Sequence, residues 1–369
     1  MTDQLERLGR LPLRENLRGL RPYGAPQLDV PILLNVNENT YGVPEDVRSA
    51  IVEAVQEAVS GLNRYPDREF TVLREHLAHY LGHGLTADNI WAANGSNEVL
   101  QHILLAFGGP GRSALGFPPT YSMYPLLAGS TGTAYVTGSR QENFNLDARS
   151  AAEEVAATGA NVVFLCSPNN PTGTALTQEV VAEVYDAGEA AQAIIIVDEA
   201  YAEFSHEGTP SALELLPGRE RLIVSRTMSK AFALAGARLG YLAAAPEIAD
   251  ALRLVRLPYH LSAVTQATAV AALTHSHRLL ANVNEIKRQR DRIVTELTGM
   301  GLTVAPSDAN FVLFGGLEDP RAVWQGLLDA GVLIRDVGIP NHLRVTAGTE
   351  KETSIFLETL ESLIRPSVS

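Results

Sequence analysis

The sequence predicts an α/β protein with two parts: a large domain in which helices sandwich a mostly parallel sheet, and a smaller α+β domain. Short apolar runs rich in β-branched residues alternate with helix-like stretches beyond residue 60. The run from Ile194 to Val197 is apolar without interruption, which is typical of a strand covered on both faces. Beyond residue 300, short strand-like runs separated by Pro and Gly turns predict the smaller domain.

Each element follows from its local pattern. The first 30 residues carry Pro12, Pro22 and Pro26 among several leucines, and we expect an extended arm there rather than a core element. Apolar residues at helical spacing behind Pro44 predict a helix over 46–60. A second, longer helix with one charged and one apolar face should run from about 274 to 299. Strands are expected at 113–117, 161–166, 193–197, 222–224, 239–243, 302–305, 310–313, 332–335 and 343–346. We therefore divide the chain into an arm (1–30), a large domain (31–255) and a small C-terminal domain (256–369).

Composition limits the classes of function. A length of 369 residues with 46% apolar residues suits two domains with buried cores. The net charge of -13 argues against nucleic acid and anionic membranes as partners. The single cysteine, Cys166, excludes an internal disulfide and fits a reducing compartment. No stretch resembles a signal-peptide core or a membrane span, so we expect a cytoplasmic protein.

Lys230 is the one lysine of three whose surroundings suit chemistry. It follows the apolar triplet at 222–224, with Thr227 and Ser229 just before it and Arg238 eight residues after it. An amine flanked by hydroxyls and a guanidinium is what a Schiff-base phosphate cofactor needs, because the amine binds the aldehyde and the other groups hold the phosphate. The alternative is that Lys230 merely ends a strand on a solvated turn.

Polar sequences follow three of the predicted strands. The first reads Cys-Ser-Pro-Asn-Asn-Pro-Thr-Gly from Cys166 and contains Asn170, the second runs from Asp198 to Tyr201, and the third ends at Lys230. The carboxyl ends of parallel strands meet at one edge of a sheet, where ligands bind. Each sequence alone could be an ordinary turn or a helix cap, but the three together favour a shared site.

A pyridine cofactor would give these residues distinct roles. Asp198 could pair with a protonated ring nitrogen, and at about 4 Å and an effective dielectric near 20 such a pair is worth roughly 4 kcal/mol. Asn170 and Tyr201 can hydrogen-bond the ring oxygen. Gly95 and Ser96 precede a helical run, so their free N–H groups could bind the phosphate.

Tyr121 offers an aromatic face that could stack on the ring, although an ordinary core tyrosine is an equal alternative. No role in this scheme requires a metal ion.

With these residues the chain resembles the fold-type I pyridoxal-phosphate aminotransferases over nearly its whole length. The resemblance rests on Asn170-Pro171-Thr172-Gly173, on Asp198-x-x-Tyr201, and on Ser229-Lys230 with Arg238. Within that superfamily the chain looks most like the histidinol-phosphate aminotransferases. The further stretches that support this are 34–39, 63–67, 226–236, 307–311 and 331–336. The visible departure is Thr40, where many relatives carry Pro.

The resemblance implies a pyridoxal phosphate cofactor bound by the large domain. Lys230 would carry it and shuttle the proton, Asp198 would pair with the ring nitrogen, and Tyr121 would stack on the ring. The phosphate would be held by Gly95, Ser96, Thr227, Ser229 and Arg238. A tyrosine matching Tyr65 reaches the cofactor phosphate of the neighbouring subunit in this family, which implies a homodimer with shared active sites.

The resemblance also implies a substrate site. Arg344 matches the arginine that grips the substrate carboxylate in most relatives. Histidinol phosphate has no carboxylate, and its phosphate would be bound there by Arg344, Arg335 and Tyr23. A phosphate carries about −1.5 to −2 charges, so two guanidiniums suit it better than one. Arg335 could instead pair with Asp336 at the surface, and Tyr23 could be a turn aromatic.

At the other end of the substrate, Asn97 and Tyr259 are the candidates for contacts with the imidazole ring.

The implied reaction is reversible amino transfer between L-histidinol phosphate and 2-oxoglutarate. It gives imidazole-acetol phosphate and glutamate, a step of histidine biosynthesis, and glutamate would use the same two arginines. An aromatic amino-acid aminotransferase shares every cofactor residue and is the nearest alternative, followed by a pyridoxal-phosphate decarboxylase of the same fold. A regulator with a DNA-binding domain and a nucleotide-binding module fit less well, because the chain is acidic and shows no Gly-x-Gly-x-x-Gly or Walker-type loop.

Overall fold

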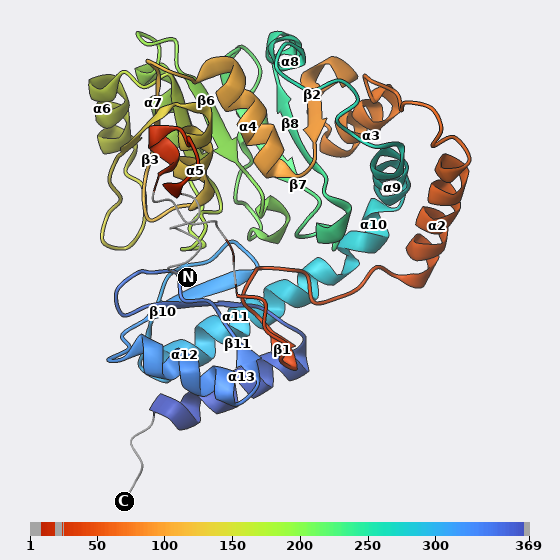
Figure 1. The fold of residues 1–369 in the computed structure, drawn as a ribbon. Coiled ribbons are helices and arrows are strands. Elements are labelled where there is room, and N and C mark those ends of the chain that lie inside the picture. The colour runs from red at the N-terminus through yellow and green to blue at the C-terminus, as the bar shows by residue number, and fades with distance from the viewer. Residues whose placement is uncertain (1–8, 19–23, 25, 365–369) are drawn as a thin grey trace, which may run out of the picture.

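The computed structural model describes residues 9–18, 24 and 26–364. Figure 1 shows a larger part built around one sheet, and beneath it a smaller part crossed by the long helix α11 (Val283–Gly299). The α/β fold class predicted from the sequence is confirmed.

The larger part contains a seven-stranded sheet with the strand order β2-β8-β7-β6-β5-β3-β4. Its strands β4, β3, β5, β6 and β7 pair in parallel, and β8 pairs antiparallel with both β7 and β2. The bounds are β2 Ile90–Ala93, β3 Ser113–Gly116, β4 Ala134–Thr137, β5 Val162–Cys166, β6 Ile194–Asp198, β7 Leu222–Thr227 and β8 Gly240–Ala244. The mostly parallel sheet and five of these strands were expected from the sequence, whereas the short strands β2 and β4 were not.

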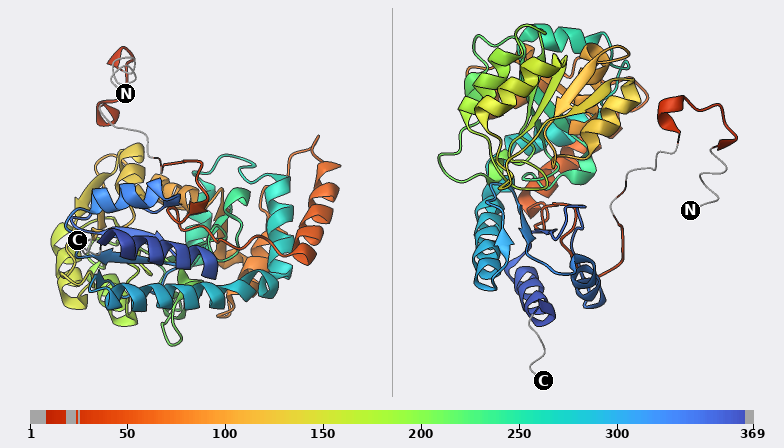
Figure 2. Two further views of the ribbon diagram at one scale, coloured as in Figure 1. Left: turned by 90° about the horizontal axis from the view of Figure 1, so that it is seen from below. Right: turned by 90° about the vertical axis from the view of Figure 1, so that its left-hand side faces the viewer.

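Helices flank this sheet (Figures 1 and 2). They are α2 Glu45–Val59, α3 Thr71–Leu81, α4 Ser96–Phe107, α5 Met123–Thr131, α6 Ala148–Thr158, α7 Gln178–Ala187, α8 Pro246–Arg253 and α9 Ala263–Thr274. The predicted helix over 46–60 is α2, shifted by one residue, and Pro44 is its N-cap residue as the sequence indicated. Side-chain oxygens cap the first turn of other helices. At the start of α6, for example, the Asp147 carboxylate accepts from the Ser150 N–H.

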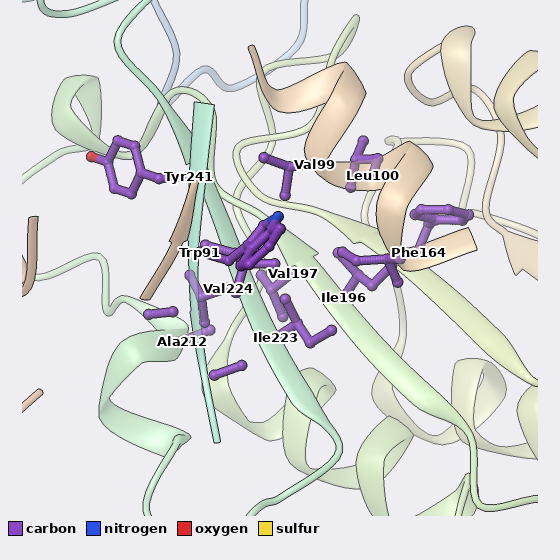
Figure 3. Close-up of a cluster of buried hydrophobic side chains, with 14 of the residues drawn as sticks. Trp91, Val99, Leu100, Phe164, Ile196, Val197, Ala212, Ile223, Val224 and Tyr241 are labelled. Atoms are coloured by element: carbon purple, nitrogen blue, oxygen red, sulfur yellow. The ribbon is translucent and has the colours of Figure 1, made fainter. Parts of the chain in front are cut away.

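The core of the larger part lies between the sheet and its helices. Every residue of β5 and β6 is buried, which explains the uninterrupted apolar runs. Figure 3 shows Trp91 of β2, Phe164 of β5, Ile196 of β6 and Val224 of β7 in one cluster of buried side chains. The strand ends are therefore fixed by a rigid core on which a site can be built.

The smaller part contains two short sheets. One has the order β12-β10-β9, and in the other β1 pairs in parallel with β11. The bounds are β1 Ile32–Leu33, β9 Thr303–Val304, β10 Phe311–Gly315, β11 Val332–Leu333 and β12 Leu343–Thr346, with helices α12 Pro320–Asp329 and α13 Glu350–Ile364. The predicted helix over 274–299 is wrong as a single element. It consists of α10 (Ser276–Leu279), a 3-10 turn at Leu280–Asn282, and α11, and Asn282 is a residue that favours helix ends over interiors.

The buried side chains form two clusters. The first surrounds the large sheet and includes Leu261 and Leu273, while the second lies among α11, α12 and α13 and includes Ile32 and Leu34. The division at residues 30 and 255 stays a prediction. It assigns Leu261 and Leu273 to the small domain and Ile32 and Leu34 to the large domain, but each pair packs in the cluster of the other part.

The amino-terminal segment is described from residue 9 to residue 18. It contains a short 3-10 turn, Glu15–Leu17. Arg14 Nη2 donates to Ser130 O at 2.9 Å and Asn16 Nδ2 donates to Gly129 O at 2.7 Å, so the segment caps carbonyl groups at the end of α5. Tyr23 lies outside the described residues. In the described part of the chain no helix is long and apolar enough to cross a membrane.

Candidate active site

A cavity of about 520 Å³ lies at the carboxyl ends of β5, β6 and β7. The parallel pairing of these three strands brings their polar ends to one edge, as the sequence predicted. Of the residues expected in the site, the cavity is lined by Ser96, Asn97, Tyr121, Asn170, Asp198, Tyr201, Thr227, Ser229, Lys230, Arg238, Arg335 and Arg344. Gly95 lies beside it against Arg238.

The Lys230 amine projects into this cavity. Its Nζ donates one hydrogen bond, to Val36 O at 2.9 Å. Burial of the amine lowers the pKa of Lys230 to about 8, and the Arg344 guanidinium acts in the same direction. A sizeable neutral fraction at neutral pH makes this amine a nucleophile, as a Schiff-base lysine must be.

Asp198 is a buried carboxylate at the end of β6. It is 3% exposed and accepts hydrogen bonds from Tyr124 OH at 2.9 Å and from Ser225 Oγ at 3.3 Å. Burial raises its pKa to about 6, although both hydrogen bonds oppose that rise. Among the described residues no cationic side chain bonds to it. A ligand with a protonated ring nitrogen would supply the missing charge.

Two polar side chains stand beside this carboxylate. Asn170 Nδ2 lies 3.5 Å from the Tyr201 hydroxyl oxygen, and Asn170 Oδ1 accepts from Arg344 Nη1 at 2.5 Å. Arg344 also donates to Asn35 O at 2.8 Å. The amide and the hydroxyl are therefore held where they can bind an oxygen of a ring ligand.

The first turn of α4 packs closely against β8 and the Arg238 side chain. Gly95 has φ +85°, and a Cβ there would collide with the Arg238 guanidinium. A Cβ on Gly240 of β8 would collide with the backbone N of Ser96. Glycine is needed at both positions so that the helix start can approach β8 and Arg238 closely. Free N–H groups and a guanidinium then face the same place, which suits a phosphate.

Two hydroxyls add to these groups. Arg238 Nη1 donates to Ser229 Oγ at 3.4 Å, and Thr227 Oγ1 donates to Ser229 Oγ at 3.0 Å. Both hydroxyls lie at the end of β7, immediately before Lys230.

Tyr121 lines the cavity, and its hydroxyl donates to Asn97 Oδ1 at 3.2 Å. Its ring also packs edge-on against Tyr124, with centroids 5.5 Å apart. Tyr121 thus packs against a core residue, as an ordinary core tyrosine would, and also lines the cavity.

Two neighbouring arginines, Arg335 and Arg344, lie at another part of the cavity wall. Arg335 and Arg344 exchange backbone hydrogen bonds of 2.9 Å in both directions, and both line the cavity. Asp336 accepts from the Gly338 N–H at 2.9 Å. No ion pair joins Asp336 to Arg335, and no acidic group elsewhere in the described ranges pairs with the Arg335 guanidinium.

Tyr65 and Tyr259 do not line the cavity of a single chain. Their rings stack with centroids 4.4 Å apart and an interplanar angle of 12°. Tyr65 is 79% exposed and Tyr259 is 39% exposed. The two tyrosines therefore form a stacked pair at the surface of the chain.

The segment Asn35 to Glu38 also lines the cavity, although the sequence analysis predicts no role in the site for these residues. Its carbonyl oxygens bind Lys230 and Arg344, and its Asn37 side chain bonds to Tyr201 at 3.0 Å. The run Asn-Val-Asn-Glu-Asn at 35–39 was already part of the resemblance and was the available signal.

A fully paired ion network lies next to the site. Arg226 Nη2 is 2.6 Å from Glu199 Oε2, and its Nη1 is 3.2 Å from Glu203 Oε1. The side chains of these three residues are 11%, 4% and 9% exposed. Ser211 Oγ donates to Glu199 at 2.8 Å and accepts from Arg226 at 3.1 Å.

These groups together fit pyridoxal phosphate. The buried carboxylate of Asp198 suits the ring nitrogen, Asn170 and Tyr201 suit the ring oxygen, and the start of α4 with Arg238 suits the phosphate. The Lys230 amine lies in the same cavity with a lowered pKa.

Comparisons with known proteins agree with this geometry. The model of the family "Aminotransferase class I and II" matches residues 29–360. A histidinol-phosphate aminotransferase of Paenarthrobacter aurescens (strain TC1) is 77% identical over 364 residues, 99% of this chain and 98% of that protein. A histidinol-phosphate aminotransferase of Thermobifida fusca (strain YX) is 58% identical over 350 residues, 95% of each chain. The crystal structure of histidinol-phosphate aminotransferase from Sinorhizobium meliloti in complex with pyridoxal-5'-phosphate has a TM-score of 0.86 at 26% identity, covering 96% of this chain and 98% of that one. The chain therefore belongs to the class I and II aminotransferase family, in the group of the histidinol-phosphate aminotransferases.

Proposed function

We propose that this enzyme transfers an amino group between L-histidinol phosphate and 2-oxoglutarate, giving imidazole-acetol phosphate and glutamate in histidine biosynthesis. One observation carries the choice of substrate: the guanidiniums of Arg335 and Arg344 line the same cavity as the Lys230 amine. The names of the relatives that match nearly the whole chain support the same reaction.

Bound pyridoxal phosphate would supply the aldehyde that carries the amino group and the ring that accepts electrons. The chain's own residues would hold it in place. Asp198 would keep the ring nitrogen protonated, while Asn170 and Tyr201 bind the ring oxygen and Tyr121 lies against the ring. The phosphate would be held by Gly95, Ser96, Thr227, Ser229 and Arg238.

Lys230 has two tasks in this scheme. Its amine would hold the cofactor, and it would also act toward the substrate as general base and general acid. A pKa of about 8 suits both tasks, because the neutral amine takes the proton and the ammonium returns it at nearly the same pH.

The two arginines would bind the substrate phosphate. A doubly charged phosphate can accept from two guanidinium forks at once. Glutamate would place one carboxylate there, so one site serves both halves of the reaction. Asn97, in the cavity, is our candidate for the imidazole end, and Tyr23 would close over the phosphate from the arm.

We further propose a homodimer with shared active sites, working in the cytoplasm. The stacked pair Tyr65 and Tyr259 is exposed, and Leu254 and Leu257 nearby along the chain are 85% and 77% exposed. Large apolar side chains exposed in this way favour burial against a partner. Tyr65 would reach the cofactor phosphate of the partner subunit, and Tyr259 would contact the imidazole there. A buried free thiol at Cys166 fits a reducing compartment.

The test is kcat/KM for histidinol phosphate and for phenylalanine, each with 2-oxoglutarate and added pyridoxal phosphate. We expect a strong preference for histidinol phosphate, no release of carbon dioxide, and no turnover by Lys230→Ala. A preference for phenylalanine would favour the aromatic aminotransferase and overturn the phosphate site. Near-normal multiple turnover by Lys230→Ala would contradict its catalytic role.

A further inference from the structure

The hydroxyl of Tyr201 lies between two side-chain amides. Asn37 Nδ2 is 3.0 Å from the hydroxyl oxygen and Asn170 Nδ2 is 3.5 Å from it. Tyr201 and Asn37 are 5% and 1% exposed. An amide offers donors at one end and an acceptor at the other, so the orientation of these two amides decides where the single Tyr201 proton can point.

Arg344 fixes the first amide. A guanidinium only donates hydrogen bonds, and Arg344 Nη1 lies 2.5 Å from Asn170 Oδ1. The oxygen of Asn170 must therefore face Arg344, and its NH₂ group faces Tyr201.

Thr346 fixes the second amide. The backbone N–H of Asn37 donates to Thr346 Oγ1 at 3.1 Å, and Thr346 Oγ1 in turn lies 3.1 Å from Asn37 Oδ1. With the Asn37 amide oxygen toward Thr346, the Thr346 hydroxyl accepts from the Asn37 backbone N–H and donates to Asn37 Oδ1. The reverse orientation would point a second N–H donor at Thr346 Oγ1 and leave the Thr346 hydroxyl proton without an acceptor in the described part of the chain.

The backbone of Asn37 is also held in place. Its φ of 58° lies in the left-handed region, which asparagine tolerates better than most residues. Its carbonyl accepts from Asn310 Nδ2 at 3.1 Å, and Asn310 is fully buried. The amide therefore keeps both its position and its direction.

We propose that Asn37, oriented by Thr346, is a positioning residue that makes Tyr201 a hydrogen-bond donor toward the cofactor ring oxygen. Both amides direct N–H groups at the Tyr201 oxygen, so its own proton is directed into the cavity that Tyr201 lines. Thr346 belongs to β12 of the smaller part, and Tyr201 follows β6 of the larger part. The inference rests on the proposed binding of pyridoxal phosphate.

The consequence is a change in protonation of the bound cofactor. A donor to the ring oxygen stabilises its anionic form, which favours loss of the neighbouring proton. The visible absorbance of the enzyme-bound cofactor changes with pH as that proton is lost. Removal of the donor should therefore raise the pH midpoint of the absorbance change.

Thr346→Val is the decisive variant, because Thr346 does not line the cavity. Without the hydroxyl, the Asn37 amide can turn its oxygen toward Tyr201 and take up the Tyr201 proton. We expect the midpoint to rise by about half a unit to one unit, the size of one net hydrogen bond. Thr346→Ser keeps the hydroxyl and should stay close to the wild type. In a Tyr201→Phe background, Thr346→Val should shift nothing further.

A midpoint that stays at the wild-type value in Thr346→Val, or that rises equally with Phe at position 201, would overturn the proposal. If Thr346→Val does not fold, Asn37→Asp takes its place, because a carboxylate only accepts. Its rise should then be larger with Tyr201 present than with Phe at position 201, and equal rises would overturn the proposal. Failure of the proposed function looks different: the wild type would show no pH-dependent visible band with pyridoxal phosphate.

Discussion

Two buried carboxylates, Asp198 and Glu199, are neighbours in sequence and opposites in surroundings. Successive side chains at a strand end point to opposite sides. Glu199 faces Arg226 and forms the ion network with Glu203. Asp198 faces the cavity, where its polar partners are the neutral hydroxyls of Tyr124 and Ser225.

The difference separates structure from function. A buried charge costs several kcal/mol unless a counter-charge and hydrogen bonds offset the cost. In the network around Arg226, each of the two carboxylates already contacts a nitrogen of the guanidinium. The carboxylate of Asp198 and the guanidinium of Arg335 have no counter-charge among the described residues, and both line the cavity. In our proposal, the cofactor ring nitrogen neutralises Asp198 and the substrate phosphate neutralises Arg335.

The largest effect should follow from breaking the complete network. Arg226→Met removes the one cation and leaves the carboxylates of Glu199 and Glu203 buried without a counter-charge. We expect the free energy of unfolding to fall by about 3–5 kcal/mol, measured by urea denaturation at fixed protein and cofactor concentrations. Arg149→Met, which removes the exposed pair with Glu153, is the matched control and should change little. A small effect of Arg226→Met would mean that the two carboxylates do not depend on Arg226 as their counter-charge.

Removing the charge of Asp198 should have the opposite effect: in the absence of the cofactor it should raise the free energy of unfolding. Burial raises the pKa of Asp198 to about 6, above the ordinary value near 3.9. The folded chain then binds this proton more tightly than the unfolded chain, so stability is lost as the pH rises from about 4 through 6. Asp198→Asn should remove the loss. The cofactor-free variant should be more stable than the wild type by up to about 3 kcal/mol at pH 8, a difference that disappears toward pH 4.

Bound pyridoxal phosphate should make the wild type more stable than Asp198→Asn. With saturating cofactor the wild type gains the ring nitrogen as partner for Asp198, and the variant does not. Thermal unfolding of both proteins with and without the cofactor, at pH 8, measures the reversal. If Asp198→Asn were destabilising in both conditions, Asp198 would be a structural residue like Glu199.

Much of the site could be predicted from the sequence because its residues directly follow strands. Asn170, Asp198 and Lys230 each lie within a few residues of an apolar run, and parallel pairing brings such ends together. The same logic predicted the central strands of the sheet. The weak strand β4 was missed because its residues are exposed or half-buried and lack the apolar run of a covered strand.

Other features depend on contacts far apart in the chain. The bond between Asn37 and Thr346 joins residues 309 positions apart, and its meaning depends on the direction of an amide. The pairing of Arg226 with Glu199 likewise appears only when β6 and β7 lie side by side. Local patterns in the sequence contain no sign of either pairing, since each partner alone looks like an ordinary polar residue.

The smallest effect should come from the second incomplete charge, Arg335. Arg335→Met leaves the cofactor site and Arg344 intact but removes one of the two guanidiniums proposed to bind the substrate phosphate. A hydrogen bond to a charged group is worth about 1.5–3 kcal/mol, so kcat/KM for histidinol phosphate should fall roughly tenfold to a hundredfold. Phenylalanine has a single carboxylate that Arg344 alone can bind, and its kcat/KM should change much less. Arg335→Lys keeps the charge and loses the fork, and should lie between wild type and Met. Equal losses for both substrates would instead mean that Arg335 supports the structure of the cavity and does not bind the substrate phosphate.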